Sequence, residues 1–167
     1  KEKSVHLWVG DFVHRLLEKH LKGELTQEDI KQIEPSVRTE CEEMIENDKQ
    51  YVIYTVERLI KGYLDFWQED PLNIVATEMW MEVDVPGIDG VILSGRVDAL
   101  SRSESGRLWR VEHKTTSKMD SPYLNGLKNS LQDAIYNFLS EVTFEEQVEG
   151  TIFNLFVKTK EAKFERA

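Results

Sequence analysis

The spacing of apolar residues changes along the chain, and this change limits the folds available to it. Residues 4–22 and 49–68 carry apolar side chains at steps of three and four, which is the period of an amphipathic helix. Residues 77–87 alternate apolar and polar side chains, as a half-buried strand does. Residues 124–142 return to the helical period. The sequence therefore predicts an α/β fold in which helices both precede and interrupt a sheet.

Three further segments favour strands. Residues 90–100 follow an Asp-Gly turn, and residues 107–117 follow a loop rich in Ser and Gly, so 77–117 is predicted to be a three-stranded meander. Residues 148–159 come after the helical segment. Because a strand after a crossover helix usually lies parallel to a neighbour, we expect a mixed sheet of about four strands flanked by helices.

Residues at the expected helix ends agree with this reading. Gly23 is suited to end the first helix, and Thr26 with Asp29 has the spacing of a capping box at the start of the next. Pro35 is expected to interrupt or restart that helix, and Pro71 to stop the long one before it.

Length and composition indicate a single domain covering 1–167, with a helical segment at 1–70 and a core of sheet and crossover helix at 77–159. The single cysteine, Cys41, excludes a disulfide framework and a local Cys/His metal cluster. No apolar run reaches membrane-spanning length and no signal peptide is recognisable, so we expect a cytoplasmic protein with no membrane partner.

The net charge of −10 argues against a protein that coats nucleic acid nonspecifically. The charge is uneven, however. Residues 24–70 hold 13 acids and 5 bases, whereas the rest of the chain holds 18 acids and 16 bases. Residues 96–118 carry six bases against three acids. Local contact with nucleic acid therefore remains compatible with the composition.

The pattern Glu112-His113-Lys114 is the strongest candidate for chemistry. An acid-x-Lys triplet alone is weak, since Asp29-Ile30-Lys31 and Glu161-Ala162-Lys163 have it too. This one lies late in an expected strand, and the strand before it ends at Asp98. Adjacent hairpin strands can bring Asp98 beside Glu112, and residues two apart on a strand share a face, so Lys114 points the same way as Glu112.

Two carboxylates and a lysine at one place suit phosphodiester hydrolysis. Carboxylates held close repel each other unless a cation lies between them, and hard oxygen ligands favour Mg²⁺ or Mn²⁺. A neighbouring Lys can orient a water or stabilise developing negative charge. The alternative is that Glu112 and Lys114 form an exposed ion pair contributing at most about 1 kcal/mol, and that Asp98 simply ends a strand.

The segments "SGRVDAL" and "WRVEHKTTS" resemble the PD-(D/E)XK nuclease superfamily, and within it the RecB-type exonuclease branch that includes phage exonucleases and CRISPR-associated adaptation nucleases. That branch carries G-x-x-x-H on an early helix, matched here by Gly10 and His14. It also carries Q-x-x-x-Y on the helix after the E-x-K strand, matched by Gln132 and Tyr136. The resemblance implies a restriction-endonuclease-like core.

The resemblance also implies a role for each matching residue. Asp98 and Glu112 would bind the metal, with His14 and the backbone carbonyl of His113 as further ligands, and Lys114 would be the catalytic lysine. Gln132 and Tyr136 would line the active site and touch DNA or the reacting water, and Glu78 is a further acid that such folds sometimes bring close. Taken alone, the residues have simpler interpretations: His14, Gln132 and Tyr136 are packing residues, and the His113 side chain is structural.

Cofactor and substrate follow from the same resemblance. The expected ion is Mg²⁺ or Mn²⁺. Many members of the branch also bind an iron–sulfur cluster through four cysteines, which the lone Cys41 cannot supply. The local bases expected to contact nucleic acid are Arg96, Arg110, Lys118 and Lys128.

We therefore expect a metal-dependent DNA nuclease, an exonuclease that favours single strands or ends and hydrolyses phosphodiester bonds with a metal-activated water. The resemblance also suggests a protein partner in a recombination or replication complex of a bacterial or phage-infected cell. Three alternatives stay open: a structure-specific endonuclease, a catalytically silent nucleic-acid-binding module on the same fold, and an acidic domain whose helices at 24–70 bind a basic protein.

Overall fold

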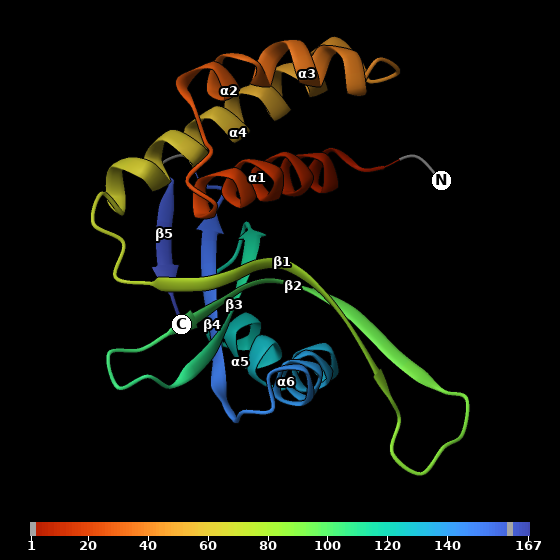
Figure 1. Ribbon diagram of the computed structural model, residues 1–167. Helices are drawn as coiled ribbons and strands as arrows, with labels where there is room; N and C mark the ends of the chain where they lie inside the picture. Colours follow the sequence, from red (N-terminus) through yellow and green to blue (C-terminus); the bar gives the residue numbers. More distant parts are fainter. Residues whose placement is uncertain (1–2, 160–161) are drawn as a thin grey trace. The chain divides into compact units, whose positions relative to one another are not determined.

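The computed structural model describes residues 3–159 and 162–167 (Figure 1). Helices and strands follow one another along the chain in the order expected, with helices first and then a meander, a crossover and a returning strand. In sequence they are α1 (Val5–Leu21), α2 (Gln27–Lys31), α3 (Ile33–Glu40), α4 (Glu46–Phe66), β1 (Asn73–Asp84), β2 (Ile92–Arg102), β3 (Leu108–Thr116), α5 (Ser121–Lys128), α6 (Leu131–Phe144), β4 (Val148–Val157) and β5 (Lys163–Arg166).

The chain divides into two compact units whose segments alternate along the sequence. Unit 1 consists of Lys1–Asp70, Lys114–Ser117 and Leu155–Phe164. Unit 2 consists of Pro71–His113, Lys118–Asn154 and Glu165–Ala167. Strands β3, β4 and β5 each contribute residues to both units. The expectation of a single domain over 1–167 stays a prediction.

Local signals explain where the helices of unit 1 begin. The capping box predicted at Thr26 and Asp29 is confirmed, with the Asp29 amide donating to the Thr26 hydroxyl at 3.2 Å and the Thr26 amide donating to the Asp29 carboxylate at 2.9 Å. Lys19 and these Thr26 contacts lower the pKa of Asp29 to about 2. Pro35 lies in the first turn of α3, where its missing amide hydrogen costs no helical hydrogen bond.

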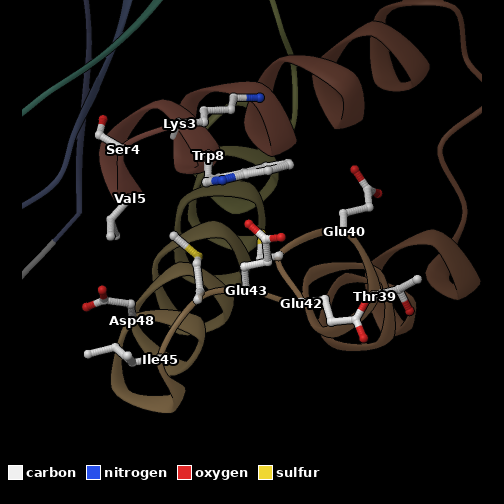
Figure 2. A pocket seen from close by; sticks show the side chains of 12 residues that line it. Lys3, Ser4, Val5, Trp8, Thr39, Glu40, Glu42, Glu43, Ile45 and Asp48 are labelled. Carbon is white, nitrogen blue, oxygen red and sulfur yellow. The ribbon is translucent and has the colours of Figure 1, made fainter. Parts of the chain in front are cut away.

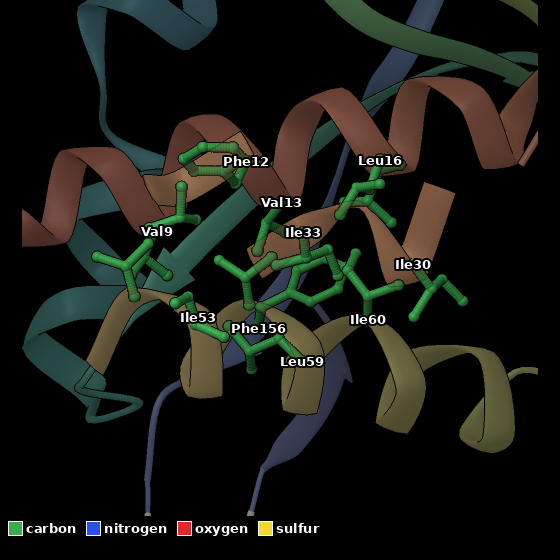
Figure 3. Close-up of a cluster of buried hydrophobic side chains, with 14 of the residues drawn as sticks. Val9, Phe12, Val13, Leu16, Ile30, Ile33, Ile53, Leu59, Ile60 and Phe156 are labelled. Atoms are coloured by element: carbon green, nitrogen blue, oxygen red, sulfur yellow. The ribbon is translucent and has the colours of Figure 1, made fainter. Parts of the chain in front are cut away.

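The core of unit 1 lies between the helices α1, α2, α3 and α4 and one strand segment (Figure 3). The apolar stripe predicted for the first helix is buried at Val9 and Phe12, and the stripe predicted for α4 is buried at Val56 and Ile60. Phe156 of β4 is fully buried in the same cluster. Each such side chain stabilises the fold by about 1.5–3 kcal/mol relative to leaving it in water.

The meander predicted for unit 2 is confirmed. β1 pairs antiparallel with β2 from Asn73↔Arg102 to Asp84↔Ile92, and β2 pairs antiparallel with β3 from Arg102↔Leu108 to Ala99↔Val111. The sheet order is β1-β2-β3-β4-β5, so the sheet has one strand more than the four we expected.

β5 is the strand that the sequence did not predict. The backbone groups of Phe153 and Ala167 exchange hydrogen bonds of 2.8 and 3.1 Å, as antiparallel neighbours do. The strand has four residues and one large apolar side chain, Phe164, which is too short a pattern to distinguish from a loop.

The segment 124–142, expected to be one helix, is two. Asp120 caps α5 by accepting the Tyr123 amide at 3.0 Å, and α5 ends at Lys128. A new helix, α6, starts at Leu131 after Ser130. The apolar period continues across the break, which explains why periodicity alone joined the two helices.

The alternation of β1 breaks near Glu78, in addition to a shift of the β1–β2 register between Ile74 and Ala76. Ala76, Met79 and Met81 all pack in the core cluster of unit 2, although strict alternation would put Ala76 on the opposite face from the two methionines. Glu78, between them, has φ of 47°, in the left-handed region that costs a non-glycine residue on the order of 1–3 kcal/mol. This backbone turns the two halves of β1 so that both face the same core.

None of the helices in the described ranges is long and apolar enough to cross a membrane.

Phe156 offers a direct test of the unit 1 core. Its ring centroid lies 4.9 Å from that of Tyr63 and 5.7 Å from that of Phe164. Phe156→Ala should lower the free energy of unfolding by about 3–5 kcal/mol, because it removes buried contacts and leaves a cavity. Urea unfolding measures this. Leu7→Ala, at a residue 61% exposed on α1, is the control and should change stability by less than about 0.5 kcal/mol. Equal losses in both variants would contradict this core.

Candidate active site

The Asp98 side chain accepts a hydrogen bond from the backbone of His113, the residue between Glu112 and Lys114. In the β2–β3 register, Asp98 and Glu112 come one residue past the pair Ala99↔Val111. The backbone amide of His113 donates a hydrogen bond of 2.7 Å to Oδ2 of Asp98. The Asp98 carboxylate is therefore held against the residue that follows Glu112, and the two predicted carboxylates belong to one local arrangement within unit 2.

Glu112 is held in turn by a buried arginine. Arg110 is 1% exposed, and its Nη1 donates to Oε2 of Glu112 at 2.7 Å. Its Nη2 donates to the Asp133 carboxylate and, at 3.0 Å, to the Thr151 hydroxyl. Its Nε donates to Oδ1 of Asn137 at 3.0 Å. The guanidinium thus connects β3 with α6 and β4.

The helix that carries the Q-x-x-x-Y motif is α6. It packs closely against β2 at Gly95, which has no side chain to keep the two elements apart. A Cβ added at Gly95 would lie 2.6 Å from Cε1 of Tyr136 and 3.2 Å from Cδ1 of Leu139. The Tyr136 ring therefore occupies space that any side chain at Gly95 would need. Tyr136 is half-buried, with its ring centroid 5.6 Å from the guanidinium carbon of Arg110, whereas Gln132 is exposed.

His113 and Lys114 alternate along β3 as predicted for a strand. The His113 side chain is 3% exposed, and its Nδ1 lies 3.1 Å from the Asn154 amide nitrogen. This packing supports the expectation that the His113 side chain is structural. Lys114 is half-buried and follows Glu112 by two residues, so strand alternation gives both side chains the same face.

The G-x-x-x-H motif lies on α1 in unit 1. A Cβ added at Gly10 would lie 3.3 Å from the Thr115 hydroxyl, so the glycine allows a close approach of α1 to the end of β3. His14 is one turn further along α1 and is half-buried. Its assignment as a metal ligand stays a prediction.

The bases expected to contact nucleic acid differ in exposure. Lys118 and Lys128 are exposed, and the Arg96 side chain is 63% exposed while its Nε lies 2.8 Å from the Glu78 carboxylate. The expectation for Arg110 does not hold, because a guanidinium 1% exposed and bonded to two carboxylates presents no surface to a phosphate. Glu78, considered as a further acid of the site, is engaged by Arg96.

The donor set fits a hard divalent cation by its chemistry. Carboxylate and backbone carbonyl oxygens are the ligands that Mg²⁺ and Mn²⁺ prefer, and Asp98, Glu112 and the backbone of His113 meet at one place on the sheet. Among residues 3–159 and 162–167, no three His, Cys, Asp or Glu side chains form a group that could hold a metal ion.

A pocket of about 870 Å³ opens between the start of α1 and the connection from α3 to α4 (Figure 2). The residues that line it do not include any of the predicted site residues. Glu40, Glu42, Glu43 and Asp48 give it an acidic lining, which repels phosphate. Of the other acid-x-Lys triplets, the first has its acid, Asp29, in the capping box of α2, and the second has Glu161, which lies outside the described residues.

Sequence reasoning missed the residues that bind the Arg110 guanidinium, which in turn holds Glu112. Asp133 and Asn137 lie one turn apart on α6, next to Gln132 and Tyr136, and Thr151 lies on β4. The one available signal was Arg110 itself, which precedes Glu112 by two residues on a strand and therefore shares its face.

The fold is of the restriction-endonuclease-like class. A model of the PD-(D/E)XK nuclease superfamily matches residues 1–167, and the chain belongs to that superfamily. A crystal structure of a protein from Eubacterium rectale, provisionally described as an exonuclease, is similar in fold, with a TM-score of 0.56 and 14% sequence identity. The match covers 100% of this chain and 59% of that one. The comparison with curated proteins gives no match.

Gly95 tests the contact between β2 and α6. Gly95→Ala should lower the free energy of unfolding by about 1–3 kcal/mol, because the new methyl group overlaps the Tyr136 ring. In a Tyr136→Ala background the loss should shrink by at least about 0.5 kcal/mol. Thermal or urea unfolding of the four proteins in this cycle measures the coupling.

Gly126 is the matched control, since it lies in helix α5 with nothing within 4 Å of an added Cβ. Gly126→Ala should leave stability unchanged or raise it by about 0.4–1 kcal/mol. If Gly95→Ala costs the same with and without the Tyr136 ring, the proposed close contact is wrong.

Proposed function

We propose that this chain is a divalent-metal-dependent nuclease that hydrolyses phosphodiester bonds in DNA as an exonuclease. The observation that carries the proposal is the Asp98 carboxylate bound to the His113 amide, beside Glu112, in a chain of the PD-(D/E)XK superfamily. The provisional description of the Eubacterium rectale protein supports the exonuclease mode.

Asp98 and Glu112 would hold the cation, with the backbone carbonyl of His113 and the imidazole of His14 as further ligands. A bound divalent cation supplies Lewis-acid chemistry: it draws electron density from a phosphate oxygen and makes a nearby water easier to deprotonate. The hydrogen bond from the His113 amide orients the Asp98 carboxylate before any ligand arrives, so less conformational freedom is lost on binding.

Lys114 would act on the phosphate. Its ammonium group is a compact charge with three donors, suited to bonding a non-bridging phosphate oxygen and stabilising the negative charge that develops as water attacks phosphorus. Gln132, exposed on α6, and Tyr136, one turn later, would contact the substrate.

The proposed substrate is DNA, with single strands or ends favoured. Arg96, Lys118 and Lys128 are exposed and would contact its phosphates, whereas Arg110 is excluded from this role by its burial. The family resemblance supports a setting in the cytoplasm of a bacterial or phage-infected cell and a protein partner in recombination or replication.

One incubation series tests the proposal. End-labelled single-stranded and double-stranded DNA and RNA are treated with the protein in Mg²⁺, Mn²⁺ or EDTA, and products are resolved by length. Mononucleotides released from DNA ends, only in the presence of metal, are expected. Defined internal fragments would indicate an endonuclease, and intact substrates that are nonetheless retained by the protein would indicate a silent binding module.

Lys114→Ala should reduce the rate of hydrolysis by at least about 100-fold, because it removes a charge aimed at the transition state. Asp98→Ala and Glu112→Ala should reduce it at least as much. Single-turnover cleavage at saturating Mn²⁺ measures the rates. Lys61→Ala, which removes an exposed ion pair of α4, is the control and should cleave normally.

Thermal melting adds a measurement independent of activity. Mn²⁺ should raise the melting temperature of the wild-type protein and fail to raise that of Asp98→Asn, because the asparagine binds the ion weakly. An equal rise in both proteins would remove Asp98 from the metal site, and near-normal cleavage by Lys114→Ala would remove the proposed role of the lysine.

His14→Ala should weaken Mn²⁺ binding by about 10-fold or more while the protein remains folded. Imidazole is a softer donor than carboxylate, so its loss should affect Mn²⁺ more than Mg²⁺. Calorimetric titration with each ion measures the effect.

His6→Ala is the matched control, because His6 is exposed on the same helix, with its ring centroid 6.1 Å from that of Tyr51. Unchanged Mn²⁺ affinity in both histidine variants would make His14 a packing residue and would leave the RecB-type branch without support from this motif.

A further inference from the structure

Arg110 has a set of contacts that a surface base would not need. Its side chain is 1% exposed, and each of its three nitrogens donates to a partner in the same unit. Nη1 bonds Glu112 at 2.7 Å, Nη2 bonds Asp133 and Thr151, and Nε bonds Asn137 at 3.0 Å. Burial of a guanidinium is costly without such partners, so this arrangement is specific to arginine.

The shape of the guanidinium determines what these contacts do. Its donors lie in one plane at fixed angles, so the bonds from Nε and Nη2 to α6 and β4 fix the direction in which Nη1 points. The Glu112 carboxylate receives that donor and is oriented by it. A lysine would supply the charge without the fixed geometry.

The far side of the network belongs to the Q-x-x-x-Y helix. Asp133 and Asn137 are one turn apart on α6, and the Thr151 hydroxyl donates to the Asp133 carboxylate at 2.7 Å. The Tyr136 ring lies 5.6 Å from the guanidinium carbon, within reach of a cation–π contact. One side chain therefore connects Glu112 with the helix that carries Gln132 and Tyr136.

We propose that Arg110 is a positioning residue: it orients the Glu112 carboxylate toward the cation and fixes that carboxylate relative to α6. This inference rests on the proposed function, in which Glu112 is a metal ligand. Groups that hydrogen-bond a ligating carboxylate set its direction, and their loss typically reduces metal affinity or activity by about 10–100-fold.

The principal variant is Arg110→Lys, which keeps the charge and loses the planar set of donors. Calorimetric titration with Mn²⁺ and single-turnover cleavage at saturating Mn²⁺ are measured below the melting temperature of the variant. We expect both Mn²⁺ affinity and the cleavage rate to fall by about 10-fold or more. A loss of thermal stability with wild-type Mn²⁺ affinity and wild-type cleavage would overturn the proposal and leave a purely structural arginine.

Arg102→Lys is the matched control in the same unit. Arg102 donates from both terminal nitrogens to the Glu146 carboxylate, at 2.8 and 2.6 Å, and lies four residues from Asp98 along β2. It should lose stability and keep Mn²⁺ affinity and cleavage. If Arg102→Lys reduces both as strongly as Arg110→Lys, the effect is general and the proposal fails.

Asp133→Asn tests the connection to α6 without changing Arg110 or Glu112. It replaces Arg110→Lys as the test if that variant does not fold. It weakens one anchor of the guanidinium, so cleavage should fall, by less than in Arg110→Lys. Wild-type cleavage by a folded Asp133→Asn protein would overturn the connection to α6.

A wild-type protein that binds Mn²⁺ and leaves every nucleic acid intact would overturn the proposed function alone, since the Mn²⁺ titrations still decide the role of Arg110.

Discussion

Unit 2 is organised around a buried positive charge that needs partners on several sides. A guanidinium withdrawn from water must have its donors satisfied by the protein, and Arg110 achieves this only where β3, α6 and β4 supply an acid, an amide oxygen and a hydroxyl together. The same requirement brings α6 close to the sheet, and Gly95 leaves the space that the Tyr136 ring then fills. Packing and polar contacts therefore select the same position for α6 on the sheet.

Asp98 lies where the first two strands of the meander, β1 and β2, change face. Val97 and Leu100 of β2 pack in one core cluster, as Ala76 and Met79 of β1 do, so both strands depart from simple alternation beside Asp98. The left-handed backbone of Glu78 is the local cause on β1. A strained backbone of this kind persists only where the surrounding contacts hold it in place. Here Glu78 lies opposite Asp98, whose carboxylate accepts a hydrogen bond from the His113 amide.

The elements of the fold that the sequence predicted are those whose buried side chains form a regular pattern within one segment of the chain. Helix α1, helix α4 and the meander have long, regular apolar patterns that few other structures satisfy. β5 and the break between α5 and α6 depend on partners remote in sequence, and their local patterns are too short or too continuous to reveal them. Arg110 was misjudged for a related reason: a count of local bases treats every arginine as exposed, and burial of this one depends on Asp133 and Thr151.

The net charge of −10 says little about where nucleic acid would lie, because many acids of the helical segment are already paired on its surface. Glu40 is bonded to Arg15 through both carboxylate oxygens, and Arg38 bonds Glu34 and Glu46. Arg96 is different: Glu78 holds its Nε while 63% of the side chain stays exposed. An arginine oriented in this way loses less conformational freedom on meeting a phosphate than a mobile lysine does. Under the proposed function, the orientation of individual bases therefore matters more than the total charge for where a phosphate backbone would bind.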